Sequence, residues 1–524
     1  MWERFSYYGM RALLVFYLTK HWFFTDSESG VIYGAYTALV YITPVLGGYL
    51  ADRYLGQRKA VLYGAVLLTV GHVLMGVEGS GAEVLTAQSP PAVEAEAAEL
   101  APAALEAAQA AGIDSAMAEV ARDATILNVF WLALAFIIVG SGFLKANISV
   151  IVGQLYPRAD TRRDGAYTIF YMGINLGAFL GSLLCGWLGE TYGWSYGFGA
   201  AGIGMLLGLV VFVIGKPLLM GRGEPPRPEE LKRSSLGLPF EWLLYLWGLV
   251  AVVVCWYLVQ NQALVGSLLG ISGLALVAYV ISTAVMKLDA IERNRIFAAL
   301  FLIVCSILFW ALFEQAGSSL NLLTDRLVDR EIFGQEVPAS TFQSINAIYI
   351  ILLAPVLAGL WTFMGRKGIE PSAPMKFGLG MIQLGGGFLV LVLGAQGAGA
   401  DGLIPVLFIF LIYLLHTTGE LCLSPVGLSA MNKLAPAYMA SLIMGTWFFA
   451  SATGNFVAGL IASAIGSGAL ESEGEGLGSG YMETVIEVYS NIGWVAVGVG
   501  VGIMIVSPLV KRMMHLDSLG EQTA

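Results

Sequence analysis

Charged residues are scarce in this chain of 524 residues. Only 12% of the residues are Asp, Glu, Lys or Arg, whereas roughly a quarter is usual in soluble domains. Apolar residues make up 57%, and the mean hydropathy is +0.75. This composition excludes an ordinary soluble globule and predicts an all-α membrane protein that crosses the bilayer many times.

Cysteine and histidine are also rare, with four residues of each. Every cysteine falls in an apolar run and none belongs to a CxxC pair, so we interpret them as packing residues. The histidines are scattered over different runs, and no nucleophile constellation or phosphate-binding loop stands out. We therefore expect no metal, no organic cofactor, no nucleic-acid partner and no enzyme activity. A membrane-embedded enzyme or a scaffold without flux is the alternative from a different functional class.

Apolar runs long enough to cross about 30 Å of hydrocarbon as helices recur along the whole chain. Their length and their internal glycines favour helices over the short alternating strands of a barrel. We predict fourteen spans, near residues 1–24, 29–50, 58–78, 125–153, 165–189, 196–215, 240–260, 264–286, 296–318, 342–364, 376–396, 403–428, 438–465 and 485–510.

Basic residues favour loops on the cytoplasmic side of a membrane. When the loops are assigned alternately to the two sides, one set holds twenty Lys and Arg residues and the other holds four, which are Lys20, Arg122, Arg326 and Arg330. This asymmetry predicts that both termini are cytoplasmic.

Two polar segments interrupt the apolar pattern. Residues 79–124 form an acidic insertion rich in Ala and Glu, which we interpret as a solvated external hairpin with short helices separated by prolines. The Pro- and Arg-rich stretch "KPLLMGRGEPPRPEELKRSS" lies near the middle of the chain and predicts a cytoplasmic linker. The predicted units are residues 1–217, a linker with two further spans at 218–292, and residues 293–524.

Six ionisable residues lie inside predicted spans, where a charge is costly unless it has a partner or a function. Three are bases and three are acids, so we expect pairing between helices. The alternatives are a purely structural set of pairs, or residues near span ends that reach the membrane surface. The six are Glu3, Arg4, Arg11, Lys145, Glu314 and Glu420.

The spacing of polar residues indicates that several face one interior. Arg4, Tyr7, Tyr8 and Arg11 follow the i, i+3, i+4, i+7 pattern of a single helix face. Small residues at 142, 146, 149 and 153 form a stripe that permits close helix packing beside Lys145. In later spans, Trp310 precedes Glu314 by one turn, and Glu420 precedes Ser424 by one turn.

Six segments, in order, resemble motifs of the proton-dependent oligopeptide transporter family of the major facilitator superfamily. "WERFSYYGMRALL" resembles the first-span ExxERFxYYG motif of the family, although its first glutamate would fall before Met1, so we expect the native helix to begin earlier. "GGYLADRYLGQRKAVLYG" and "FYMGINLGAFLG" resemble two further signatures, and "GFLKAN", "FWALFEQ" and "GELCLSP" complete the set.

The resemblance implies two six-helix halves, two extra helices at 240–286 as in bacterial members, and a site at the membrane midplane between the halves. It implies that Arg4 and Lys145 meet a peptide carboxylate near Tyr7, Tyr8 and Tyr41. Glu420, Asn175 and Asn346 would meet the amino terminus, while Trp310, Trp447 and Ser424 would line side-chain pockets. The pairs Arg11 with Glu314 and Lys145 with Glu420 resemble the gating salt bridges of the family. Asp52 and Arg53 would belong to a cytoplasmic gate.

The function implied is a symporter of the bacterial inner membrane that imports di- and tripeptides, and possible peptide-like drugs, with a proton as the coupling ion. Animal relatives carry a histidine where this chain has Gly34, so coupling would rest on carboxylates such as Glu3 and Glu314. The alternative is a carrier or exchanger of nitrate or another small anion, since three cations would also suit an anion. Glu420 argues against that alternative.

Overall fold

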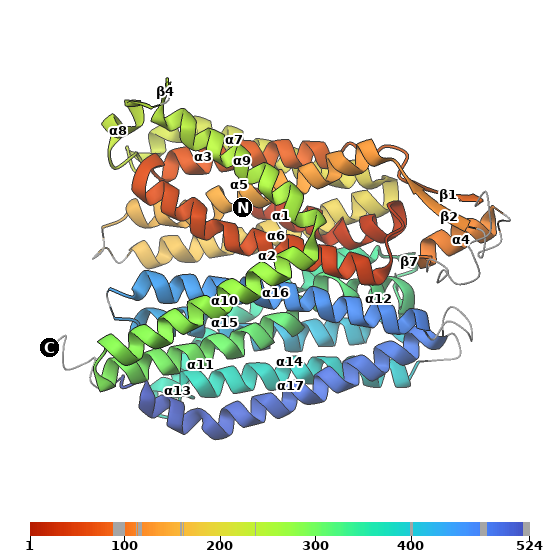
Figure 1. The fold of residues 1–524 in the computed structure, drawn as a ribbon. Coiled ribbons are helices and arrows are strands. Elements are labelled where there is room, and N and C mark those ends of the chain that lie inside the picture. Colours follow the sequence, from red (N-terminus) through yellow and green to blue (C-terminus); the bar gives the residue numbers. More distant parts are fainter. Residues whose placement is uncertain are drawn as a thin grey trace.

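Long helices running side by side account for most of the chain (Figure 1). The computed structural model describes residues 1–86, 100–111, 113, 118–157, 160, 162–235, 237–398, 402–436, 438–471 and 479–516. Within these residues, thirteen helical segments are long and apolar enough to cross a membrane. Each corresponds to one of the predicted spans from 29–50 onwards, so the predicted all-α polytopic class is confirmed.

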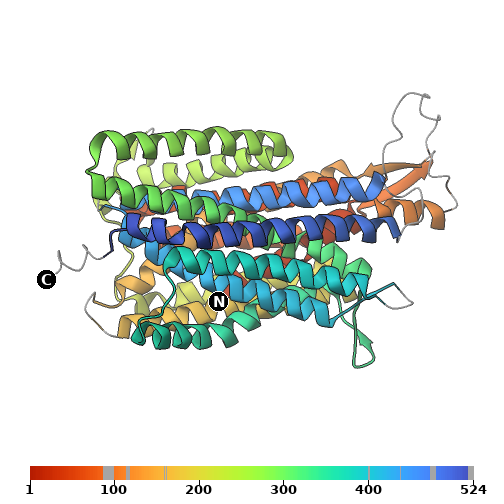
Figure 2. The same ribbon diagram turned by 90° about the horizontal axis from the view of Figure 1, so that it is seen from below.

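The first predicted span differs from the other thirteen. It forms helix α1, Trp2–Phe16, which continues as the π-helical turn η1, Tyr17–His21. This segment carries Glu3, Arg4, Arg11 and Lys20, which lowers its apolar character. A fourteenth span therefore stays a prediction. Met1 lies midway along the bundle in both ribbon views (Figures 1 and 2).

The first part of the chain continues with α2 (Asp26–Leu50), η2 (Ala51–Leu55), α3 (Gln57–Met75), β1 (Ala82–Thr86), α4 (Pro102–Ala110), β2 (Ala118–Arg122), α5 (Ala124–Gln154), α6 (Arg162–Tyr192) and α7 (Trp194–Ile214). The middle holds η4 (Lys216–Leu219), α8 (Pro228–Lys232), β3 (Ser234–Ser235), β4 (Leu238–Pro239), α9 (Phe240–Gln260) and α10 (Gln262–Lys287). The α9 and α10 helices lie together at one side of the bundle, at the top of Figure 2.

The last part contains α11 (Ala290–Phe313), η5 (Glu314–Gly317), α12 (Ser319–Leu327), β5 (Val328–Asp329), β6 (Glu331–Ile332), β7 (Gln335–Glu336), η6 (Ala339–Gln343), α13 (Ser344–Arg366), α14 (Ala373–Gln396), β8 (Ile404–Pro405), α15 (Leu407–Leu434), α16 (Ala440–Glu471) and α17 (Ser479–Met513). Local sequence explains where several helices begin. The Thr25 hydroxyl and the Glu28 carboxylate form a capping box at the start of α2, and Asp289 caps α11.

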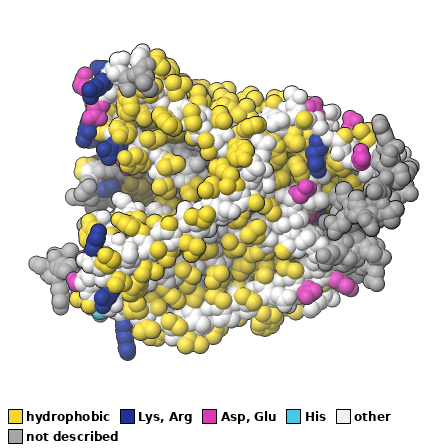
Figure 3. Space-filling model, in the orientation of Figure 1, with side chains coloured by type: hydrophobic (Ala, Val, Ile, Leu, Met, Phe, Trp, Pro, Cys, Tyr) yellow, Lys and Arg dark blue, Asp and Glu magenta, His cyan; other side chains and the backbone are white. Residues whose placement is uncertain are grey.

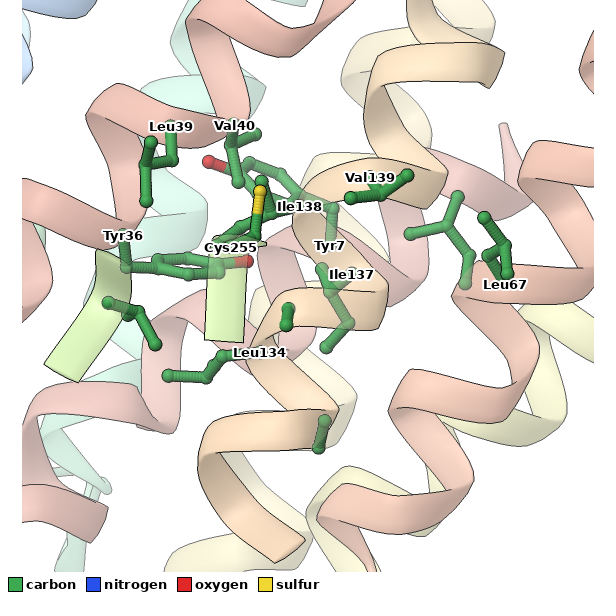
Figure 4. Packing of buried hydrophobic residues seen from close by; sticks show 14 of the residues in the cluster. Tyr7, Tyr36, Leu39, Val40, Leu67, Leu134, Ile137, Ile138, Val139 and Cys255 are labelled. Atoms are coloured by element: carbon green, nitrogen blue, oxygen red, sulfur yellow. The ribbon is translucent and has the colours of Figure 1, made fainter. Parts of the chain in front are cut away.

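Two large hydrophobic clusters, with two smaller ones beside them, hold the bundle together in the described residues. One gathers residues of α1, α2, α3, α5, α7, α9 and α10, together with Phe456 of α16. Figure 4 shows part of it, with Tyr7, Tyr36, Leu134 and Cys255 from four helices. The other cluster runs from Val280 to Met514. The predicted unit boundaries at 217 and 292 stay predictions.

Glycines let the helices approach closely at two places. A Cβ on Gly34 of α2 would lie 2.7 Å from Gly459 Cα of α16, so this position has no room for a side chain. A Cβ on Gly47 of α2 would lie 2.2 Å from the Gly142 carbonyl oxygen of α5. The second contact confirms that the small-residue stripe beside Lys145 is a packing surface.

The two ends of the bundle differ in charge (Figure 3). We call the basic end the one where α3, α9 and α14 begin and α10, α15 and α17 end; its residues include Arg58, Lys59, Lys433 and Lys511. The opposite end, here the acidic end, carries Asp26, Glu78, Asp325 and Glu336. Lys and Arg gather on the left of Figure 3, at the basic end.

Strands occur only in short pieces within the described residues. In the predicted external insertion, β1 and β2 pair antiparallel with Ala82 opposite Arg122, and α4 packs beside β1. Sequence reasoning expected helices there and missed the strands, because their apolar alternation is weak and their pairing is not local. Helix α4 begins at Pro102 as expected. Most of the proline-rich part lies outside the described residues.

The predicted linker packs against the basic end. Arg58 Nε and Nη2 donate to the two carboxylate oxygens of Glu224 at 2.6 and 3.0 Å. These bonds hold the pKa of the Glu224 carboxyl below its usual range.

Candidate functional site

A cavity of about 280 Å³ lies between helices of the first part of the chain and helices of the last part. It is lined by residues of α1, α2, α6, α11, α13, α15 and α16, together with Glu314 and Ala316 of η5 and Gln343 of η6. Eleven sequence-predicted site residues line it: Arg4, Tyr8, Arg11, Tyr41, Asn175, Trp310, Glu314, Asn346, Glu420, Ser424 and Trp447. Five predicted residues do not, namely Glu3, Tyr7, Asp52, Arg53 and Lys145.

Helix α1 supplies the cationic side of the cavity. Its i, i+3, i+4, i+7 spacing brings Arg4, Tyr8 and Arg11 to the cavity, while Tyr7 is fully buried beside it. Arg4 forms an ion pair with Glu3, with 3.2 Å between Nε and Oε2. Glu3 thus neutralises part of the charge without lining the cavity.

Arg11 links the two parts of the chain. Its guanidinium forms an ion pair with Glu314 and a hydrogen bond with the Tyr33 hydroxyl. Only 7% of the Arg11 side chain and 3% of the Glu314 side chain are exposed. Because removal of one partner of a buried pair leaves the other charge uncompensated, this ion pair ties α1 to η5.

Lys145 is buried on α5 next to the cavity. Its ammonium lies 3.9 Å from the centre of the Tyr7 ring and 5.0 Å from that of Tyr41, a cation–π arrangement. Among the residues that the structure describes, Nζ has no hydrogen-bond partner. The predicted pair between Lys145 and Glu420 is not formed in this structure, because the ammonium faces the tyrosine rings and Glu420 has a different partner.

The anionic side of the cavity comes from α13 and α15. The Asn346 side-chain amide donates to Glu420 Oε2 at 3.1 Å and to the Thr417 hydroxyl at 3.0 Å. These bonds orient the carboxylate and use one of its two oxygens. Glu420 therefore retains acceptor capacity on its other oxygen.

Aromatic and small polar side chains fill the space between the charges. Trp310 of α11, Trp447 of α16 and Ser424 of α15 line the cavity as predicted. Asn175 also lines it, and its side-chain amide donates to the Tyr171 carbonyl oxygen at 3.0 Å. The cavity thus combines charged groups with apolar walls, an arrangement suited to a small polar ligand with variable side chains.

The acidic end is closed by contacts between the two parts of the chain. Arg326 of α12 binds Asp26 of α2 through two hydrogen bonds of 2.5 and 2.9 Å, and Lys20 Nζ lies 2.6 Å from Asp325 Oδ2. These pairs and the α2–α16 glycine contact join the first and last parts of the chain on this side of the cavity.

Asp52 and Arg53 lie away from the cavity, near the basic end. Asp52 accepts a hydrogen bond from the Gln57 side chain at 2.7 Å, and the Arg53 guanidinium lies 6.0 and 5.7 Å from the ring centres of Tyr49 and Tyr54. These contacts are local. A role of both residues in a gate at this end stays a prediction.

The family model described as the POT family matches residues 58–474 of this chain. Peptide transporter YePEPT from Yersinia enterocolitica is 35% identical, and the alignment covers 88% of this chain and 85% of that protein.

This chain belongs to the POT family.

Further comparisons agree with membership in the POT family. The uncharacterised transporter YclF from Bacillus subtilis is 32% identical over 98% of this chain and 92% of that protein. Dipeptide and tripeptide permease A of Salmonella typhimurium is 29% identical over 100% and 93%. A crystal structure of a mutant peptide transporter POT with alafosfalin has a TM-score of 0.76 and 32% identity, covering 98% of this chain and 93% of that one. The predicted fold class is confirmed, and the chain is a transporter rather than an enzyme.

Sequence reasoning missed several residues that line the cavity of this POT family member or bond to its lining. Tyr33, which bonds Arg11, is one helical turn before Thr37 and two before Tyr41, so the i, i+4, i+8 spacing in α2 could have identified it. Tyr171 lies one turn before Asn175 and could have been found in the same way. Gln343 lies in η6, where no helical period was available as a signal.

Proposed function

We propose that this chain is a proton-coupled symporter that imports di- and tripeptides across the bacterial inner membrane by alternating access. The observation that carries the proposal is the charge arrangement of the cavity. Arg4 and Arg11 from α1 line the same cavity as Glu420 from α15, so the cavity offers cations to a carboxylate and a carboxylate to an ammonium. A zwitterionic peptide carries one such group at each end.

We assign recognition of the two peptide termini to these groups. Arg4 would bind the terminal carboxylate, with Lys145 contributing through the electrostatic field from behind Tyr41. Glu420, held by Asn346, would bind the ammonium, and Asn175 would assist. Trp310, Trp447 and Ser424 would contact the side chains of the peptide. Because packing against these walls is loose, peptides with different side chains would fit. Peptide-like molecules with the same two charges would also fit.

We assign proton coupling to carboxylates. Protonation of Glu314 would remove the anionic partner of Arg11 and weaken the contact between α1 and the α11–η5 segment. A proton could thereby bias the transporter between two arrangements. No side chain at Gly34 can take this role, because Gly459 occupies the space. Glu3 and Glu420 are further candidates for proton coupling. Apart from the coupling proton, we propose no cofactor.

We also propose that the basic end faces the cytoplasm, following the distribution of Lys and Arg, and that both termini lie on that side. In this orientation the closed acidic end is periplasmic, and the structure corresponds to a state closed to the outside. The predicted units 1–217 and 293–524 would rock against each other around the cavity.

Uptake of radiolabelled dialanine into proteoliposomes tests the function. An inward proton gradient should drive accumulation above the external concentration, and a protonophore should abolish it. Accumulation that is equal with and without the gradient would contradict symport. Uptake of nitrate that dialanine does not inhibit would instead support the anion carrier, for which Glu420 has no use.

A further inference from the structure

A second, larger cavity of about 660 Å³ lies at the basic end, among α13, α14, α15 and α17, and Tyr171 of α6 lines both this cavity and the first one. The charged residues in its lining are Lys376, Lys433, Lys511 and Glu370. The lining therefore has a surplus of positive charge.

One of the three lysines is already neutralised. Lys376 Nζ lies 2.5 Å from Glu370 Oε1 and 4.5 Å from the centre of the Trp361 ring, and the residue is only 6% exposed. Lys433 and Lys511 are exposed at the ends of α15 and α17. Within the described residues, neither of these two ammonium groups has an ion-pair partner.

The lining of the cavity changes from basic to apolar along its length. From Lys433, the lining positions of α15 continue one turn at a time through Ser429 and Pro425 to Leu421. Leu357 of α13 adds an apolar wall. A basic mouth thus leads into an apolar interior.

The surroundings of the cavity favour a lipid over a soluble ligand. Helix α13, one of its walls, presents exposed Val356, Leu360 and Phe363, a surface that faces hydrocarbon in a membrane. The basic end of a transporter helix lies at the depth of lipid headgroups. A zwitterionic peptide fits less well, because the one carboxylate of the lining, Glu370, is paired with Lys376.

We propose that this cavity binds an anionic phospholipid, with the phosphodiester at Lys433 and Lys511 and an acyl chain along Leu357 and Leu421. The Lys376–Glu370 pair closes one wall and contributes no net charge. The assignment rests on the cavity and its charges, together with the placement of the basic end at a membrane surface, and does not require that the chain transports peptides.

Native mass spectrometry of the detergent-solubilised full chain tests the proposal. The protein is titrated with dioleoyl phosphatidylglycerol or with dioleoyl phosphatidylcholine, and the bound lipid is counted. The wild type should retain one phosphatidylglycerol in preference to phosphatidylcholine. The double variant Lys433→Gln/Lys511→Gln should weaken phosphatidylglycerol binding about twenty-fivefold, since each lysine near an anionic lipid contributes about fivefold.

Two control variants distinguish the loss of positive charge at the cavity from a general effect of substitution on the protein. The double variant Lys433→Arg/Lys511→Arg should retain binding, because both positive charges remain. Lys287→Gln removes a lysine at the basic end outside the cavity lining and should change nothing. Equal retention of both lipids by the wild type, or unchanged phosphatidylglycerol binding in Lys433→Gln/Lys511→Gln, would overturn the proposal. Displacement of the lipid by inorganic phosphate or by dialanine at similar concentrations would also overturn it, by identifying a soluble occupant.

Discussion

Replacement of Glu420 by Gln should selectively remove recognition of the peptide ammonium. In the structure, one oxygen of this carboxylate accepts a hydrogen bond from Asn346, and the other remains available to a ligand. A hydrogen bond to a charged group contributes about 1.5 to 3 kcal/mol. Acetylation of the dialanine amine removes the ligand's charge and should therefore weaken binding to the wild type by roughly tenfold to a hundredfold.

The Glu420→Gln variant should show a different pattern. Its glutamine is neutral, so the penalty for acetylation should shrink, whereas the penalty for amidation of the dialanine carboxylate should persist through Arg4. Competition of dialanine, acetyl-dialanine and dialanine amide against a labelled peptide measures both penalties in both proteins. Glu420→Asp serves as the matched control, because it keeps a carboxylate at this position and should keep the penalty for acetylation.

One result would refute this reasoning. If acetylation is as costly in Glu420→Gln as in the wild type, the ammonium is bound elsewhere. Asn175 would then be the first residue to replace, because it lines the same cavity.

Three further predictions follow from other contacts. Glu314→Gln should abolish proton-driven accumulation of dialanine while exchange of peptide survives, because Arg11 loses its titratable partner; full accumulation in a flux assay would make the pair purely structural. Gly34→Val should lower stability by about 1 to 3 kcal/mol through overpacking against Gly459, and an unchanged melting temperature in detergent would show that α2 and α16 can separate freely. Because the folded-state pKa of Glu224 is lowered, its contact with Arg58 should stabilise the protein above the unfolded pKa of about 4.3 and lose that effect as the pH falls through the folded pKa. The melting difference between wild type and Glu224→Gln should thus be larger at about pH 7 than at about pH 3, and equal differences would contradict the assignment.

Much of the fold could be predicted because the bilayer imposes a simple constraint on sequence. Apolar runs long enough to cross the bilayer predicted thirteen of the helices. The orientation inferred from the basic residues stays a prediction. The first helix was harder to assign, since Glu3, Arg4, Arg11 and Lys20 make it the least apolar. The β1–β2 hairpin was missed because its pairing is between segments about 35 residues apart, which local pattern does not reveal.

The candidate site was predictable where charge was the signal. Ionisable residues in apolar spans identified Arg4, Arg11, Glu314 and Glu420, and all four line one cavity. Partners were harder to predict than positions, because pairing depends on the conformation of the bundle. Lys145 contacts tyrosine rings rather than Glu420. Helical periodicity in the sequence does not predict which partner a buried lysine contacts.

The larger cavity at the basic end was not predictable at all. Its lysines lie on three different helices, at ordinary helix ends where Lys and Arg are common. Only the packing of α14, α15 and α17 with one another and with α13 brings them around a shared space.

Proton movement driven by peptide is the most direct test of the account. Proteoliposomes containing a pH-sensitive dye are prepared with equal pH on both sides, and dialanine is added outside. Symport predicts that the interior acidifies as labelled dialanine enters, and that Glu314→Gln prevents the acidification. Entry of labelled dialanine with no change of internal pH in the wild type would contradict the account.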